Sequence, residues 1–304
     1  MGYDSFEHDR LALFAKYGFS GEGKWFEDGD GKKTYAIVRD GDGVPTVLVH
    51  GGIAEASIWT LMAQHMAGSI VIPDRPGYGL TYPMNYRGID YRNNAAGWLG
   101  GLVDAMGVEK VNLIGNSMGG FFCMAFACSQ PGRVNRMVLA GAPAGLDRDV
   151  PLFIRLWGSP LLGRLISLLK MSDPEKVRER IWTDLVAHPK SIPVDLIQLG
   201  IDAASLPGVA TTTRTMLGAV TTLGGWRSEL MMREAMAGLT VPTLFVWGEK
   251  DSFAPPSSGL ELANQMSDAD VVVLEDAGHV LQIDQPEVVA QLANEFLLHG
   301  AIGT

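Results

Sequence analysis

Residues 115 to 119, Gly-Asn-Ser-Met-Gly, match the pattern Gly-x-Ser-x-Gly. The apolar run 111–114 before them is typical of a β-strand, and the run 119–129 after them is typical of a buried helix. Between a strand and a helix, this pattern indicates a tight turn that lifts the serine hydroxyl clear of the sheet. The alternative is a serine that only caps the helix. The sequence therefore predicts that Ser117 is a nucleophile.

A serine hydroxyl needs a base within hydrogen-bond reach before it can attack a substrate. Of the six histidines, His279 is the candidate, because it follows the apolar run 271–274 in a short loop at the expected carboxyl edge of the sheet. A purely structural loop histidine is the alternative. His50, which precedes Gly51 and Gly52, is expected to brace its own loop.

A carboxylate must then fix the tautomer of the base and stabilise its protonated form. Asp251 lies just beyond the β-rich run 243–247, at the same expected edge of the sheet. Glu249, two residues earlier, is expected to point elsewhere. Asp74 is expected to pin its own loop together with Arg75. Asp251 is thus the predicted acid of a catalytic triad.

Acyl transfer develops negative charge on the substrate oxygen, so two backbone N–H groups should face that oxygen. One should come from the residue after the nucleophile, Met118. The other should come from the glycine-containing loop after the first parallel strand. There Gly52 is the predicted donor and Ile53 is the alternative.

The hydrophobic pattern predicts the elements that must position these residues. Residues 24–26 and 34–39 flank a turn-rich segment and predict a hairpin. From residue 46 onward, short apolar runs alternate with helical segments, which predicts a mostly parallel sheet with helices on both faces. The expected strands are residues 46–49, 70–72, 111–114, 137–139, 243–247 and 271–274, and a last helix is expected at residues 286–298.

Strand signals stop after residue 144 and resume near residue 241, and residues 145–240 show only helical periodicity. An insertion after the carboxyl end of a strand lies over the edge where ligands bind. We therefore predict a helical cap at 145–240 between two parts of an α/β core, 1–144 and 241–304, with a decorative or dimerising subdomain as the alternative. Ten side chains would form an apolar roof or simply attach the cap to the core: Leu152, Phe153, Leu156, Trp157, Leu161, Leu162, Leu165, Met216, Met231 and Met232.

Of the 304 residues, 47% are hydrophobic and 19% are charged, with a net charge of −10. This composition excludes a disordered protein, and its acidity argues against a nucleic-acid or anionic-membrane surface. The richest apolar stretch, residues 152–171, contains arginines and a proline, so no membrane insertion is expected. Cys123 and Cys128 are expected to be buried and reduced. We expect a cytoplasmic protein that takes a small-molecule substrate and needs no metal or other cofactor, and the oligomeric state is left open.

The chain resembles the α/β-hydrolase superfamily. The matching pieces are His50-Gly-Gly52, Asp74-Arg-Pro-Gly-Tyr-Gly79, Gly115-Asn-Ser-Met-Gly-Gly120, Trp247-Gly-Glu-Lys-Asp251 and Gly278-His279, with nucleophile, acid and base in the family order. The resemblance implies an eight-stranded sheet, a nucleophile elbow and a helical cap. Serine in place of aspartate at the nucleophile disfavours dehalogenase and epoxide-hydrolase chemistry. The elbow is common in meta-cleavage-product hydrolases, but Val280 stands where a tryptophan often follows their histidine, and their longer glycine-rich oxyanion loop is missing.

Together these residues predict a serine hydrolase that cleaves a carboxylic ester of a small or medium apolar acyl or aromatic substrate through an acyl-enzyme. One alternative is hydrolysis of a carbon–carbon bond in a vinylogous diketone, as in meta-cleavage-product hydrolases. A cofactor-free perhydrolase is a second alternative. A non-catalytic ligand-binding protein, from a different functional class, is the third.

Overall fold

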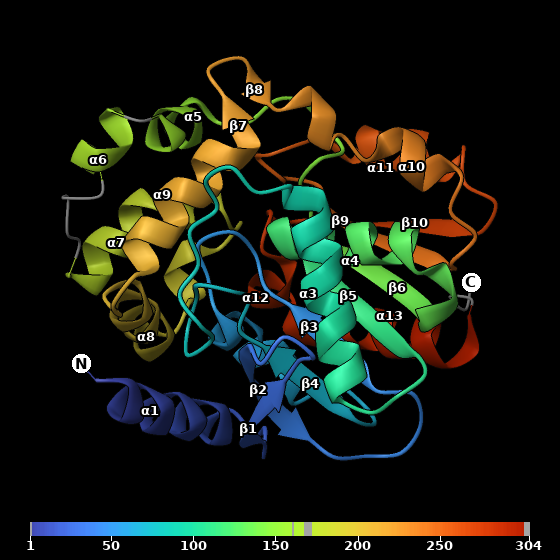
Figure 1. The fold of residues 1–304 in the computed structure, drawn as a ribbon, viewed down its shortest axis with the longest axis horizontal. Helices are drawn as coiled ribbons and strands as arrows, with labels where there is room; N and C mark the ends of the chain where they lie inside the picture. Colours follow the sequence, from blue (N-terminus) through green and yellow to red (C-terminus); the bar gives the residue numbers. More distant parts are fainter. Residues whose placement is uncertain (1, 160, 167–171, 301–304) are drawn as a thin grey trace.

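A computed structural model of the chain describes residues 2–159, 161–166 and 172–300 (Figure 1). Part of the apolar stretch 152–171 therefore lies outside the described residues. The strands are β1 (Glu22–Glu27), β2 (Lys33–Arg39), β3 (Thr46–Val49), β4 (Ile70–Pro73), β5 (Val111–Asn116), β6 (Val134–Ala140), β7 (Thr221–Thr222), β8 (Gly225–Trp226), β9 (Thr243–Gly248) and β10 (Ala269–Leu274). The α-helices are α1 (Tyr3–Lys16), α2 (Thr60–Ala63), α3 (Tyr91–Ala105), α4 (Met118–Ser129), α5 (Leu152–Gly158), α6 (Leu162–Ile166), α7 (Pro174–Arg180), α8 (Val194–Ala204), α9 (Val209–Val220), α10 (Arg233–Ala237), α11 (Pro256–Ala263), α12 (Leu281–Asp284) and α13 (Pro286–His299).

Eight strands of the described chain form one sheet in the order β1-β2-β4-β3-β5-β6-β9-β10. β1 and β2 pair antiparallel, which confirms the predicted hairpin, and β2 is also antiparallel to β4. The other neighbouring strands are parallel. The carboxyl ends of β3, β5, β9 and β10 therefore lie at the same edge of the sheet, although their loops are far apart in the sequence.

Helices cover both faces of the sheet: α3 and α4 lie on one face and α13 lies on the other (Figure 1). All residues of β3, β5 and β9 are buried, because the two helical layers exclude water from both faces of these central strands. β10, at the end of the sheet, is mostly half-buried or exposed. The predicted α/β-hydrolase fold with an eight-stranded sheet is confirmed.

The segment between β6 and β9 contains helices α5 to α10, as the periodicity predicted, but also one pair of short strands. β7 and β8 pair antiparallel and have two residues each. The sequence analysis missed them, because two residues are too few to show an alternating pattern.

A buried ion pair attaches the N-terminal helix α1 to the core. The side chain of Arg10 is fully buried, and its Nη1 donates to both carboxylate oxygens of Asp74, at 2.9 and 2.8 Å, and to Glu55 at 3.0 Å. Asp74 does pin its own loop, because its Oδ2 accepts the backbone N–H of Leu80 at 2.9 Å, but its charge pairs with Arg10 rather than with Arg75. Arg75 reaches the other way, since its Nη2 donates to the carbonyl oxygen of Gly51 at 2.6 Å.

The described residues bear on membrane insertion, metal binding and the state of the cysteines. None of their helices is both long and apolar enough to cross a bilayer. Within the same ranges, no group of three or more His, Cys, Asp or Glu side chains is placed to hold a metal ion. Both cysteines are free thiols. Cys123 is buried as predicted, but Cys128, in the last turn of α4, is only partly buried.

Candidate active site

Ser117 occupies a sharp turn between β5 and α4. Its φ of 53° and ψ of −116° are unusual for a residue with a side chain and store strain. A Cβ atom on Gly119 would lie 2.0 Å from the carbonyl oxygen of Val49, and one on Gly115 would lie 2.7 Å from Cα of Gly120. Only glycine therefore fits at these two positions. The turn presents Ser117 at the carboxyl edge of the sheet, where the sequence pattern placed it.

His279 and Asp251 form a hydrogen-bonded pair at the same edge. Nδ1–H of His279 donates to both carboxylate oxygens of Asp251, at 3.0 Å each. These oxygens also accept the backbone N–H groups of Ala142, at 2.8 Å, and Phe253, at 2.9 Å. Burial by itself would raise the pKa of Asp251, but His279 and the hydrogen bonds lower that pKa below its ordinary value. Asp251 is therefore ionised and accepts the Nδ1–H of His279.

The second ring nitrogen of His279, Nε2, is buried and has no hydrogen-bond partner among the described residues, Ser117 included. Hydrogen bonds of this kind are often long in a free enzyme and tighten in the substrate complex. A neighbouring side chain connects the two loops. Nδ2 of Asn116 donates to the backbone oxygens of Ala140, at 2.6 Å, and of His279, at 3.1 Å. The base loop, residues 275–280, is thereby attached to the turn that carries Ser117.

The loop after β3 lies beside the residue that follows Ser117. A Cβ atom on Gly52 would lie 3.9 Å from Cβ of Met118. The imidazole of His50 braces this loop, because its Nε2 accepts the backbone N–H of Arg75 at 2.8 Å and its Nδ1–H donates to the carbonyl oxygen of Gly51 at 3.0 Å. Burial and the charge of Arg75 hold the pKa of His50 well below its ordinary value. His50 is therefore a neutral structural residue, as expected.

Glu249, the rival of Asp251, has a different hydrogen-bond partner. The side chain of Glu249 accepts the backbone N–H of Asp276 at 3.3 Å, whereas the imidazole of His279 faces Asp251. Ile53, the alternative to Gly52, is 44% exposed, and the choice between the two backbone N–H groups stays a prediction.

Residues 184–188, which follow α7, contact the base loop from outside the sheet. The backbone N–H of Val280 donates to the carbonyl oxygen of Leu185 at 2.9 Å. Nε2 of His188 lies 2.7 Å from a carboxylate oxygen of Asp276. The sequence analysis missed the role of His188, because its partner is 88 residues away and only the tertiary fold brings them together.

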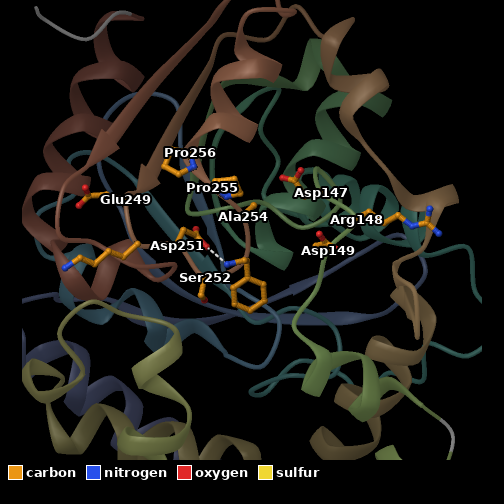
Figure 2. A pocket seen from close by; sticks show the side chains of 11 residues that line it. Asp147, Arg148, Asp149, Glu249, Asp251, Ser252, Ala254, Pro255 and Pro256 are labelled. Carbon is orange, nitrogen blue, oxygen red and sulfur yellow. Dashed lines mark hydrogen bonds between the residues drawn. The ribbon is translucent and has the colours of Figure 1, made fainter.

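A pocket of about 540 Å³ is lined by residues 147–149 and 249–256 (Figure 2). The ring of Phe253 lines this pocket and also stacks on the imidazole of His279, with ring centroids 4.1 Å apart and an interplanar angle of 25°. Phe253 therefore covers one face of the imidazole. The sequence analysis missed Phe253, although an aromatic residue two positions after the predicted acid was a visible signal.

The predicted apolar roof is only partly correct. Met216 and Met232 are fully buried, and Met231 is partly buried. The following predicted roof residues are instead exposed to solvent: Leu152, Phe153, Leu161, Leu162 and Leu165. They belong to α5 and α6 or lie between them, at the periphery of the helical segment (Figure 1). Leu156 and Trp157 are half-buried.

Comparisons with known proteins agree with this architecture. The sequence model of the alpha/beta hydrolase fold family matches residues 45–286. A 2-hydroxy-6-oxo-6-phenylhexa-2,4-dienoate hydrolase of Burkholderia cepacia is 27% identical over 280 residues, which cover 86% of this chain and 90% of that protein. A 2-hydroxy-6-oxononadienedioate/2-hydroxy-6-oxononatrienedioate hydrolase of Dechloromonas aromatica is 29% identical over 276 residues, with coverage of 85% and 89%.

Solved structures are similar over most of their length. A meta-cleavage product hydrolase from Pseudomonas fluorescens IP01 gives a TM-score of 0.74 at 25% identity and covers 92% of this chain and 98% of its own. A thermophilic esterase from Thermogutta terrifontis gives a TM-score of 0.70 at 24% identity, with coverage of 91% and 98%, and shares the fold. Since the family match spans most of the sequence and the sheet order agrees with it, the chain is a hydrolase that belongs to the alpha/beta hydrolase fold family.

Proposed function

We propose that this protein is a serine hydrolase that cleaves carboxylic esters with a small or medium apolar acyl group through an acyl-enzyme. One observation carries the proposal: His279, paired with ionised Asp251, lies on a loop that Asn116 attaches to the turn holding Ser117. A buried imidazole with a carboxylate on Nδ1 and an unpaired Nε2 is equipped to take a proton from a hydroxyl group.

In this mechanism, Oγ of Ser117 attacks the carbonyl carbon while Nε2 of His279 takes the hydroxyl proton. The oxyanion accepts hydrogen bonds from the backbone N–H groups of Gly52 and Met118. When the bond to the alcohol breaks, His279 gives its proton to the departing oxygen. A water molecule then attacks the acyl group as His279 takes one of its protons, and the carboxylic acid leaves as that proton returns to Ser117.

The surroundings of Gly52 support an apolar substrate. The side chains of Met118 and Met216 are buried, and each has an atom 3.9 Å from the position of a Cβ atom on Gly52. No polar side chain atom lies as close to that position among the described residues. We also propose that residues 145–240, which supply Met216, act as the cap over the site.

A second candidate function is hydrolysis of a carbon–carbon bond next to a ketone in a vinylogous diketone. The specific observation in its favour is that the curated relatives from Burkholderia cepacia and Dechloromonas aromatica are hydrolases of dienoate substrates. The same triad serves both reactions, because each begins with a carbonyl group beside the nucleophile. Against this candidate, Val280 follows His279 in this chain, where a tryptophan often stands in meta-cleavage-product hydrolases.

Labelling with a fluorophosphonate probe, followed by peptide mass spectrometry, tests the nucleophile. We expect one adduct on Ser117, no adduct in Ser117→Ala, and loss of at least about 10³-fold in kcat in that variant. Labelling of another residue, or unchanged turnover by Ser117→Ala, contradicts the proposal.

Parallel assays separate the two candidate reactions. The purified protein is tested on p-nitrophenyl butyrate and on a 2-hydroxy-6-oxo-dienoate, with Ser117→Ala as the blank. We expect the higher kcat/KM on the ester. Turnover of the dienoate alone would replace the ester proposal with the second candidate.

A further inference from the structure

We propose that Met216 limits the length of the acyl group that this enzyme accepts, so that short acyl esters are preferred over long ones. This inference rests on the proposed ester hydrolysis. It assigns to a single cap residue the specificity on the acyl side of the site.

Met216 reaches the loop that is proposed to bind the oxyanion. Its side chain is fully buried, and its terminal methyl carbon, Cε, lies 3.9 Å from the position of a Cβ atom on Gly52. Cβ of Met118 lies 3.9 Å from the same position. The cap methionine therefore lies against Gly52, one of the two residues whose N–H groups are proposed to hold the substrate oxygen. We infer that a carbonyl group bound to the N–H of Gly52 has its acyl chain near Met216, because such hydrogen bonds are about 3 Å long.

Helix α9 holds Met216 in a fixed place above the core. A Cβ atom on Gly77 would lie 2.4 Å from Cγ2 of Thr212, so α9 packs directly on the backbone of the loop after β4. Oγ1 of Thr212 also donates to the carbonyl oxygen of Met84 at 2.8 Å. One turn further along, Oγ1 of Thr215 accepts the backbone N–H of Tyr86 at 3.2 Å. Two hydrogen bonds thus anchor α9 to the core in the turn that precedes Met216.

The sheet order decides which part of the ester faces Met216. The loop after β3, with Gly52, lies on one side of β5, and the loops after β9 and β10, with Asp251 and His279, lie on the other side. The departing alcohol must receive its proton from His279, so it lies on the side of β10. The acyl chain is left with the side of β3, where Met216 lies against Gly52.

The test compares p-nitrophenyl esters from acetate to octanoate. A single methylene group in an apolar pocket changes specificity by roughly 10-fold or more. We therefore expect the ratio of kcat/KM for octanoate over acetate to rise at least about 10-fold in Met216→Ala and to fall in Met216→Phe. If the alanine variant does not fold, Met216→Val, which removes less side-chain volume, is measured in its place.

Met236→Ala is the matched control. Met236 is also fully buried in a helix, but its sulfur lies 4.0 Å from Sγ of Cys128, in the last turn of α4. Ser117 precedes the first turn of that helix, about 15 Å away at 1.5 Å per residue. We expect this variant to keep the wild-type ratio. An equal change in both variants would mean that any buried cavity alters the ratio, and it would overturn the inference.

Alkyl phosphonates separate this inference from the proposed function. Phosphonates that carry a methyl or a hexyl group on phosphorus react with the nucleophile without ester turnover, and their rates of adduct formation on Ser117 are compared. We expect Met216→Ala to raise the hexyl-to-methyl rate ratio at least about 10-fold. An unchanged ratio overturns the inference. If wild type hydrolyses no ester but the phosphonate ratio still rises, ester hydrolysis fails and the size limit at Met216 stands.

Discussion

Nδ2 of Asn116 donates a hydrogen bond to the backbone oxygen of His279 at 3.1 Å. This contact joins the residue before the proposed nucleophile to the proposed base. Gly141, which follows β6, packs against the same two groups. A Cβ atom on Gly141 would lie 2.3 Å from the backbone oxygen of His279 and 2.9 Å from Nδ2 of Asn116. Three loops at one sheet edge are therefore packed around a single side-chain amide.

Replacing Asn116 should impair catalysis by releasing the base loop. In Asn116→Ala we expect kcat/KM on p-nitrophenyl butyrate to fall by about 10²-fold, because a displacement of about 1 Å in a catalytic group has that effect. Asn112→Ala is the control, since Asn112 is also on β5 but donates to Val44 at the opposite end of the strand. Wild-type activity in Asn116→Ala, with a normal melting temperature, would contradict this role.

Asp251 and Glu249 should differ sharply in their effect on activity. Asp251→Asn removes the charge that faces His279 and allows the wrong tautomer, so we expect kcat to fall by up to about 10⁴-fold. Glu249→Gln should leave kcat within about 3-fold, because that carboxylate accepts the backbone N–H of exposed Asp276 and not the imidazole N–H of His279. Steady-state kinetics of both variants decide the question. Similar losses in both would remove the distinction between the predicted acid and its rival.

His50 should make stability depend on pH. In the folded protein the pKa of His50 lies well below its ordinary value, whereas in the unfolded chain it titrates near pH 6.5. Below about pH 6.5 the unfolded state therefore binds a proton that the folded state does not, and stability falls as the pH falls, by up to about 1.4 kcal/mol per pH unit, until the folded-state pKa is reached.

Urea unfolding at about pH 7, 6 and 5 checks this effect. We expect the free energy of unfolding to decrease less in His50→Gln than in wild type over this range. His65→Gln, at an exposed histidine, should follow wild type. Parallel curves for wild type and His50→Gln would show that His50 does not contribute.

The buried ion pair of α1 should be necessary for stability. Arg10→Met leaves Asp74 and Glu55 buried without their cation, and burial already raises the pKa of Glu55. Losing one partner of a buried pair destabilises a protein by roughly 3–5 kcal/mol. Lys16→Ala, which breaks the exposed pair with Asp195, should change stability by less than about 1 kcal/mol. Denaturant unfolding measures both, and equal values would contradict the prediction.

Sequence patterns among neighbouring residues were sufficient to predict several features of the structure. The Gly-x-Ser-x-Gly turn, the hairpin and the alternation of apolar runs with helical segments each depend on residues close in sequence, so the fold and the positions of Ser117, Asp251 and His279 at one sheet edge followed from the sequence. The burial of β3, β5 and β9 agrees with their uninterrupted apolar character.

Other features were decided only by the tertiary structure. Asp74 pairs with Arg10 rather than Arg75, because α1 folds back over the loop after β4. Most predicted roof residues of α5 and α6 are exposed, whereas Met216, on α9, lies against Gly52. Periodicity shows which side of a helix is apolar, but not which surface that side meets. Contacts between residues 100 or more positions apart depend on how whole elements pack, and the sequence specifies these only through the complete fold.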